Sequence, residues 1–178
     1  MQVAGRLFAL TALAGVVGAC HGVRGPGAHV SRAGGGDSVE AHAAALRFLA
    51  AFDSLQLDAV GAAMASDVTF FMPGGRLPWR RLDGRPAVVA EFRRMFEGVR
   101  ATAARSGAAA GPPTLGVGPR VRDLRVDMAA PGVAVASFHL GEGDTPGRRT
   151  FVFRREGDGV WRVVHSHASS PPPPARAP

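Results

Sequence analysis

The stretch Trp161–Ser169, with the sequence WRVVHSHAS, is the most informative part of this chain. Apolar and polar residues alternate along it, which is typical of a β-strand with one buried face. In a strand, residues two apart point to the same face. The residues expected on one face are therefore Trp161, Val163, His165 and His167. An apolar face that ends in two imidazole rings indicates the wall of a pocket.

The composition indicates a globular domain whose positive charge does not by itself point to nucleic acid. The chain has 178 residues, enough for one domain with a sizeable core, and a formal net charge of +7. All 21 basic residues are Arg, and Lys, Asn, Ile and Tyr are absent from the sequence. The codons of these four residues are rich in A and T, so this bias indicates a GC-rich genome. The arginines are scattered instead of forming a stripe, and we expect no nucleic-acid partner.

The N-terminus has the three regions of a secretory signal peptide, which we place at residues 1–19. A short basic start, an apolar run and two small residues precede Cys20, the only cysteine. This pattern resembles the lipobox of bacterial lipoproteins, in which the cysteine is lipidated and becomes the mature N-terminus. Ordinary secretion with an unpaired thiol is the alternative. We expect an exported protein, anchored to the membrane of the cell envelope through a lipid on Cys20, and otherwise secreted.

The rest of the chain divides into a tether, one folded domain and a tail. Residues 20–36 are rich in Gly, and residues 171–178 are rich in Pro, which favours an extended, disordered end. The domain spans residues 37–170. Its longest loop, residues 101–119, is rich in Ala, Gly and Pro and is the best candidate for a lid or hinge.

Three helices are predicted in the first part of the domain. Asp37 and Glu40 have the spacing of a capping box, which predicts that the first helix begins there. A shorter helix is predicted over residues 57–65. Pro86 suits the first turn of a third helix, whose apolar residues recur with helical spacing.

Most predicted strands follow the helices. The first strand covers residues 67–72, and the later ones cover residues 120–128, 133–140, 148–156 and the opening stretch. Early helices followed by hairpin-connected strands indicate an α+β fold with an antiparallel sheet.

The last hairpin can have either of two registers. A two-residue turn would place Thr150 opposite His165 and Arg148 opposite His167. A three-residue turn would place Phe151 and Arg149 there instead. The sequence does not choose between them.

The order and spacing of these pieces resemble the SnoaL-like branch of the nuclear transport factor 2-like superfamily. The resemblance covers residues 37–170. The residues that carry it are Phe48 and Phe52, DVTFFMPGG at residues 67–75, LDGRPA at residues 82–87, GRRTFVF at residues 147–153 and the opening stretch. It implies a cone of three helices and a curved antiparallel sheet around one deep pocket. It also implies a homodimer formed through the outer face of the sheet.

The known enzymes of this fold match the chain poorly. Ketosteroid isomerases place a general-base Asp just before the Pro that ends the first strand, and the matching residue here is Met72, which accepts no proton. Their oxyanion hole and the dehydratases of this fold depend on Tyr, which this chain lacks. The cyclases use an acidic base on a late strand. Neither residues 133–140 nor the opening stretch contains Asp or Glu, so a histidine would have to serve.

Two functions follow from the resemblance. The first is binding of a small apolar or aromatic ligand in the pocket, or an accessory role without chemistry. The second is an isomerase- or polyketide-cyclase-like enzyme in which His165 or His167 is the general base. The residues expected to bind the ligand are Phe71, Trp79, Phe96, His139, Arg149 and Phe151. Histidines without a carboxylate or thiol partner make a weak metal site, so we expect no metal and no cofactor.

Overall fold

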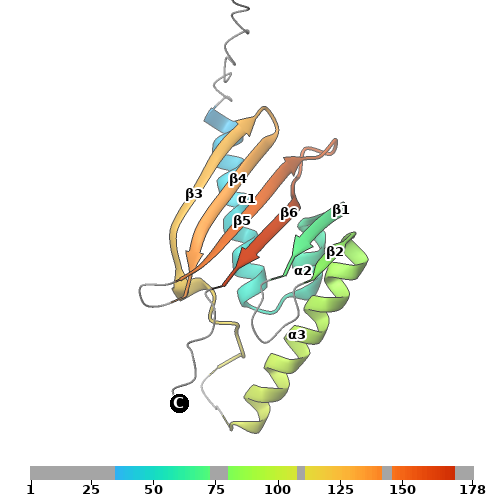
Figure 1. Cartoon of the computed structure of the whole chain (residues 1–178), viewed down its shortest axis with the longest axis vertical. Helices are drawn as coiled ribbons and strands as arrows, with labels where there is room; N and C mark the ends of the chain where they lie inside the picture. Colours follow the sequence, from blue (N-terminus) through green and yellow to red (C-terminus); the bar gives the residue numbers. More distant parts are fainter. Residues whose placement is uncertain (1–34, 73–79, 108–110, 142–145, 171–178) are drawn as a thin grey trace, which may run out of the picture.

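The computed structural model describes residues 35–72, 80–107, 111–141 and 146–170 (Figure 1). Its helices are α1 Gly35–Asp53, α2 Leu57–Ala62, α3 Arg85–Arg105 and the short 3-10 helix η1 Gly118–Arg120. Its strands are β1 Met64–Phe71, β2 Arg81–Asp83, β3 Val121–Ala130, β4 Val133–Leu140, β5 Gly147–Arg155 and β6 Trp161–Ser169. The expected signal peptide, Cys20, nearly all of the tether and the Pro-rich tail lie outside the described residues.

The strands form one mixed sheet in the order β2-β1-β6-β5-β4-β3. Neighbouring strands are antiparallel, except that β1 and β6 are parallel. The prediction of a purely antiparallel sheet is therefore wrong at this pair. Parallel neighbours need a long crossover instead of a hairpin. Here β2, α3, η1 and the strands β3 to β5 all lie between β1 and β6 in the chain.

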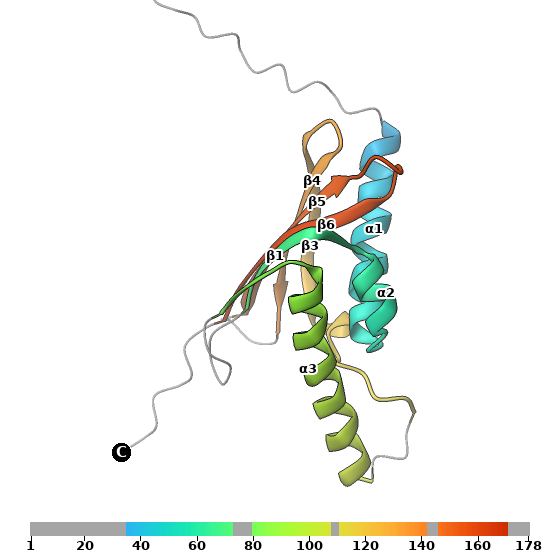
Figure 2. The ribbon, with the colours of Figure 1, turned by 90° about the vertical axis from the view of Figure 1, so that its right-hand side faces the viewer.

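The helices pack on one face of the curved sheet, which we call the inner face (Figure 2). The core between the two layers is built mainly from phenylalanine rings. The ring centroids of Phe48 in α1 and Phe151 in β5 are 5.2 Å apart, and those of Phe52 in α1 and Phe92 in α3 are 5.1 Å apart. None of the helices in the described residues is both long and apolar enough to cross a membrane.

The predicted capping box of the first helix is not formed. α1 is already helical at Gly35, so Asp37 lies inside its first turn. The Asp37 carboxylate accepts a hydrogen bond from Arg155 at 3.0 Å, and the indole of Trp161 donates to Glu40 at 3.4 Å. These two acidic side chains therefore join the first turn of α1 to the sheet instead of capping the N-terminus of the helix.

The first strand starts earlier than predicted, and the second helix is shorter. Residues 64 and 65 were expected in the helix, but Met64 pairs with Val163 of β6 and begins β1. Sheet pairing overrides local helix preference here, because propensity is a weak prior against tertiary hydrogen bonds. The edge strand β2 was not predicted at all; Leu82 pairs with Phe70 of β1.

A β-bulge in β6 changes the predicted faces of the opening stretch. Near the turn the register is that of a three-residue loop, and Phe153 pairs with Val163. The next pair is Val152 with His165, so β6 has one extra residue, Val164. An extra residue reverses the alternation beyond it. The prediction that both histidines share a face with Trp161 and Val163 is therefore wrong.

The bulge also excludes both predicted registers at the histidines. His165 lies opposite Val152, and His167 lies opposite Thr150. Each pairing is shifted by one residue from the register that the three-residue turn alone would produce. Turn length sets the register only up to the first bulge.

Candidate functional site

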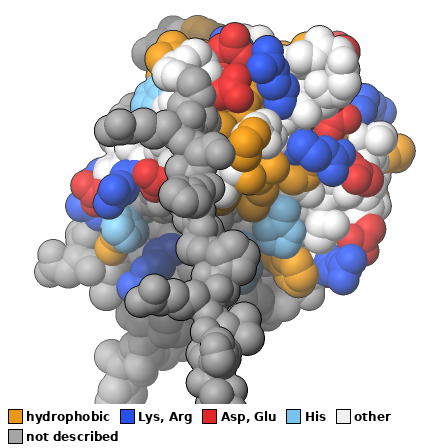
Figure 3. Space-filling model, turned by 90° about the horizontal axis from the view of Figure 1, so that it is seen from above, with side chains coloured by type: hydrophobic (Ala, Val, Ile, Leu, Met, Phe, Trp, Pro, Cys, Tyr) orange, Lys and Arg blue, Asp and Glu red, His pale blue; other side chains and the backbone are white. Residues whose placement is uncertain are grey.

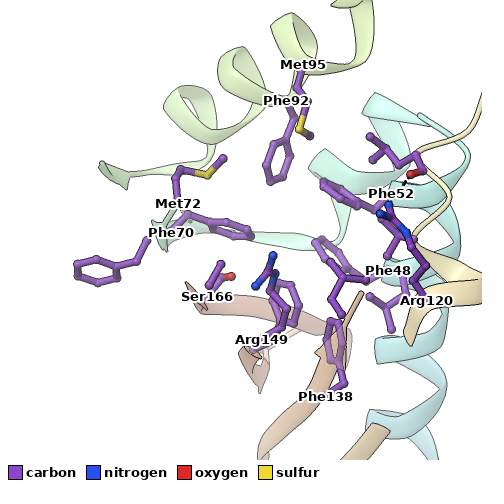
Figure 4. Close-up of a pocket in the computed structure, with 17 residues that line it drawn as sticks. Phe48, Phe52, Phe70, Met72, Phe92, Met95, Arg120, Phe138, Arg149 and Ser166 are labelled. Carbon is purple, nitrogen blue, oxygen red and sulfur yellow. Dashed lines mark hydrogen bonds between the residues drawn. The ribbon is translucent and has the colours of Figure 1, made fainter. Parts of the chain in front are cut away.

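A cavity of about 220 Å³ lies between the helices and the inner face of the sheet. Its walls come from α1, α3, four strands of the sheet and the segment before β3 (Figure 4). Nearly all of the lining side chains are apolar, and the polar ones are Arg120, Arg149 and Ser166. Among the described residues, no Asp, Glu or His side chain lines the cavity.

Phenylalanine rings form most of the wall. Phe48 and Phe52 are four residues apart in α1, which places them on one face of the helix. Phe70 of β1 lies edge-on to Phe92 of α3, with ring centroids 5.4 Å apart, and its centroid is 6.1 Å from that of Phe151 in β5. A ligand in the cavity would therefore meet aromatic surface on the helix side and on the sheet side.

Arg149 brings a positive charge into this apolar wall. Its Nη1 donates to the carbonyl oxygens of Arg148, at 2.8 Å, and Ser169, at 2.6 Å. Figure 4 shows its guanidinium beside Ser166, pointing into the cavity. Burial lowers the pKa of this guanidinium because the charged form loses solvation, although an arginine remains charged in proteins. Gly147 leaves room for the group, since a Cβ there would lie 2.9 Å from Nη1.

Ser166 is the one buried polar residue among the described residues, with 2 % of its surface exposed. It lies on the inner face between Phe70 of β1 and Phe151 of β5. Its hydroxyl has no hydrogen-bond partner within the described part of the chain, and the residue lines the cavity. The hydroxyl is not sealed in the core, so Ser166 can offer it to a polar atom of a ligand in the cavity.

Asp53, the last residue of α1, holds the wall next to η1. Its carboxylate accepts a hydrogen bond from the backbone N–H of Val117 at 2.5 Å, and its carbonyl oxygen accepts one from Leu115 at 2.9 Å. Arg120 donates to the carbonyl oxygens of Gly116, at 2.6 Å, and Leu115, at 2.8 Å. Leu115 and Val117 both line the cavity. This part of the loop expected as a lid is therefore tied to α1.

Three of the predicted ligand-binding residues line the cavity, and two others that the structure describes do not. Phe71, Arg149 and Phe151 belong to the lining. Phe96 is fully buried in the core behind it, with its ring 5.6 Å from that of Phe52. Trp79 lies outside the described residues.

The two histidines of β6 lie on the outer face of the sheet, away from the cavity. Beyond the bulge, Ser166 and Ala168 point inward, and His165 and His167 point outward. Both imidazole rings lie near the ring of Phe71, at centroid distances of 5.7 and 6.1 Å. Phe71 also has the guanidinium of Arg81 over its face, 5.9 Å from the centroid. Of these residues, Phe71, His167 and Arg81 line a second pocket of about 230 Å³ beside the cavity.

His139 is also on the outer face, because its neighbours Phe138 and Leu140 line the cavity. Its Nδ1 lies 3.0 Å from a carboxylate oxygen of Asp123 in β3. The three histidines therefore do not converge with one another. Within the described residues, no group of three or more His, Cys, Asp or Glu side chains is placed to hold a metal ion.

Several arginines of the surface differ from Arg149 in having carboxylate partners. Arg154 contacts Asp67 at 3.0 Å, and Arg162 contacts Asp158 at 2.8 Å. Seen from above, basic and acidic side chains lie next to each other around a patch of hydrophobic ones (Figure 3). The charge on this face is mixed.

Among the described residues that line the cavity, no side chain is an evident general base. Met72 is buried and lines the cavity. A guanidinium is a poor general base because it stays protonated, and a lone serine hydroxyl is a weak nucleophile without an adjacent base. The cavity can therefore enclose an apolar body and hydrogen-bond one polar group of it.

Two polar residues of the cavity were not predicted as site residues. Ser166 was expected on the opposite face from the pocket, because the strand alternation was extended through an unseen bulge. Arg120 precedes β3 and has no sequence pattern that separates it from the other arginines. The isolated serine between aromatic strand neighbours could have been found only with the register known.

Comparison with known proteins identifies the fold. No protein-family model matches the sequence, and a search of curated proteins found no significant match. A nuclear transport factor 2-like protein of unknown function from Pseudomonas putida is similar in structure, with a TM-score of 0.54, 23% sequence identity, and coverage of 76% of this chain and 87% of that chain.

Two further solved structures show the same likeness. A ketosteroid isomerase-like protein from Erwinia carotovora atroseptica has a TM-score of 0.55 at 17% identity, with 77% of this chain and 98% of that chain covered. A protein from Catenulispora acidiphila in complex with S-DNPA has a TM-score of 0.50 at 17% identity, with 74% and 91% covered. The chain therefore has the nuclear transport factor 2-like fold, and the predicted α+β fold class is confirmed.

Proposed function

We propose that this chain is an exported domain of the SnoaL-like branch that binds a small apolar or aromatic ligand in its cavity. The aromatic lining of this partly open cavity carries the proposal, because ligand sites are typically concave and lined by hydrophobic and aromatic side chains. A cavity of about 150 Å³ lined by apolar side chains accommodates benzene. The volume here, about 220 Å³, suits a ligand somewhat larger than one ring.

Binding is favoured over catalysis by the positions of the titratable groups. The candidate bases His165 and His167 point away from the cavity, and Met72 replaces the carboxylate of the isomerases. His167 lines the second pocket of about 230 Å³ together with Phe71 and Arg81, and this is the observation that favours the isomerase- or cyclase-like alternative. An accessory role without a ligand is a further alternative, and the experiment below separates it from binding.

The test is a thermal-shift screen of the purified protein against neutral and charged compounds with one or two rings. A ligand that binds only the folded state raises the melting temperature. Ala168→Leu places bulk on the inner face and should abolish the shift, whereas His167→Leu on the outer face should keep it. The proposal fails if no compound class stabilises the wild type, or if both variants respond equally.

We also propose that the chain is exported and anchored through a lipid on Cys20. The support is the sequence pattern before this cysteine. A single acyl chain binds membranes only marginally, so stable anchoring needs more than one. Mass spectrometry of the membrane fraction should find Cys20 acylated at the mature N-terminus, and Cys20→Ser should move the protein to the soluble fraction. An unmodified Cys20 in a soluble mature protein would contradict the anchor.

Finally, we propose that two copies pair through the outer face of the sheet. Val135, Val152 and Val164 lie on this face and are partly exposed. Apolar side chains on an uncovered sheet face are typical of an interface. Light scattering should give the mass of a dimer for the wild type, and Val152→Glu should give a monomer. A monomeric wild type at micromolar concentration would contradict this assembly.

A further inference from the structure

We infer that the ligand of the cavity is an organic acid, with an apolar or aromatic body and one carboxylate bound by the guanidinium of Arg149 and the hydroxyl of Ser166. This inference rests on the proposed function and names the ligand class for the same cavity.

The hydrogen bonds of Arg149 leave one side of its guanidinium available. Both recorded bonds use Nη1, which donates to the carbonyl oxygens of Arg148 and Ser169. Nη2 and Nε have no hydrogen-bond partner among the described residues. Neither atom is fully buried, so a ligand can reach them. These two nitrogens form the planar pair of donors that matches the two oxygens of a carboxylate.

Among the described residues that line the cavity with Arg149, none carries a negative charge. Within the described residues, Arg120 and Arg149 are the charged side chains of the cavity lining, and both donate to backbone carbonyl oxygens. Arg154, Arg155 and Arg162 each contact a carboxylate at 2.8 to 3.0 Å instead. A partly buried cation without an anion is unfavourable, and a carboxylate supplied by a ligand would correct this.

Ser166 adds a second donor on the same wall. Arg149 lies opposite Ala168, and Ser166 lies opposite Phe151, so the two polar residues are diagonal neighbours on the inner face of β5 and β6. Figure 4 shows them side by side. The rings of Phe70 and Phe151 flank the serine and supply the surface against which the apolar body of an acid would lie.

Gly147 is part of the same arrangement. A Cβ at this position would lie 2.9 Å from Nη1 of Arg149 and 2.9 Å from the carbonyl oxygen of Ser169. Both atoms belong to the hydrogen bond that orients the guanidinium. Glycine therefore permits the orientation of Arg149, and any larger residue would displace it.

The experiment measures binding of a matched pair, 3-phenylpropanoate and 3-phenylpropanamide, to the purified full chain by calorimetry. The acid should bind about ten- to hundred-fold more tightly, the usual gain for a hydrogen bond to a charged group. In Arg149→Met this preference should disappear while the amide still binds. The control Arg148→Met, on the exposed outer side, should keep the preference.

A second measurement needs no variant. Affinity of the wild type for the acid should fall as the pH drops through the carboxyl pKa, about 4 to 5, while affinity for the amide stays constant. If the amide binds as tightly as the acid, the acid inference is wrong and the proposed function survives. If neither they nor any compound of the wider screen binds, the proposed function itself fails. If the preference survives in Arg149→Met and is lost in Arg120→Met, the assignment to Arg149 is wrong.

Discussion

Both faces of the sheet carry aromatic and charged residues, but these residues have different surroundings on the two faces. On the inner side, Phe48 of α1 and Phe70 and Phe151 of the sheet line a cavity whose polar residues are Arg149, Ser166 and, in η1, Arg120. On the outer face, His165 and His167 lie near Phe71, and arginines pair with carboxylates. In the described part of the chain, Arg149 in the cavity has no carboxylate partner, whereas Arg154 and Arg162 outside it do. This contrast makes the inner face the candidate for ligand binding and the outer face the candidate for assembly.

The largest effect is expected from removing the bulge that separates the two faces. Deleting Val164 would restore strict alternation, so either Trp161 and Val163 or Ser166 and Ala168 must turn outward. We expect the free energy of unfolding to fall by more than about 4 kcal/mol, because several core contacts are lost together. Urea denaturation measures this. Val164→Ala is the control and should lower the free energy of unfolding by about 1 kcal/mol. If the deletion lowers it no more than this control, the bulge does not decide which side chains face the core.

Truncating one phenylalanine on each face tests how unequal the faces are. Phe153 is 1 % exposed and Phe71 is 38 % exposed. Phe153→Ala should lower the free energy of unfolding by about 3 to 5 kcal/mol, since it leaves a cavity in the core. Phe71→Ala should lower it by about 1 kcal/mol, because its ring already contacts water. Equal losses in denaturant titrations would mean that the outer face is covered as well, as in a stable dimer.

The pH dependence of stability tests the ion pairs outside the cavity. The hydrogen bond from Arg162, aided by the backbone N–H of Val160, lowers the pKa of Asp158 from 3.8 to about 2. Because the folded-state pKa is the lower one, the contribution is complete above the unfolded value of 3.8 and is lost as the pH falls through about 2. Asp158→Asn should therefore make the acid decline of stability shallower over this window. Identical acid profiles for the variant and the wild type would exclude this contribution.

The smallest effect on ligand binding is expected from substituting the histidines. These variants compare outward and inward positions of the same strand. His165→Ala and His167→Ala should leave ligand affinity within about two-fold, because neither ring reaches the cavity. Ser166→Ala, between them, should weaken binding of the acid by about five-fold, the value of one hydrogen bond. Calorimetry with 3-phenylpropanoate distinguishes these outcomes. If either histidine variant loses more affinity for the acid than Ser166→Ala does, the ligand must bind on the outer face instead.

The sequence was sufficient for much of the fold. Strands at residues 133–140 and Trp161–Ser169 have the bounds that the structure assigns to β4 and β6. The helical stripe of Phe92 and Phe96 in α3 is buried as predicted. These features depend on the periodicity of apolar residues and on turn residues, which are properties of neighbouring positions. Phe71, Arg149 and Phe151 were named as candidates, but periodicity alone does not place them, and their ligand-binding role stays a prediction.

Only the tertiary structure decided which face each residue of the last strand occupies. The parallel pairing of β1 with β6 and the bulge at Val164 arise between residues far apart in the chain. A shift of one residue turns every later side chain to the other face, so local alternation cannot reveal it. This shift places Ser166 beside Arg149 in the cavity and puts His165 outside. The sequence by itself determined that this stretch is a strand of a nuclear transport factor 2-like sheet, and long-range pairing determined which of its side chains a ligand can meet.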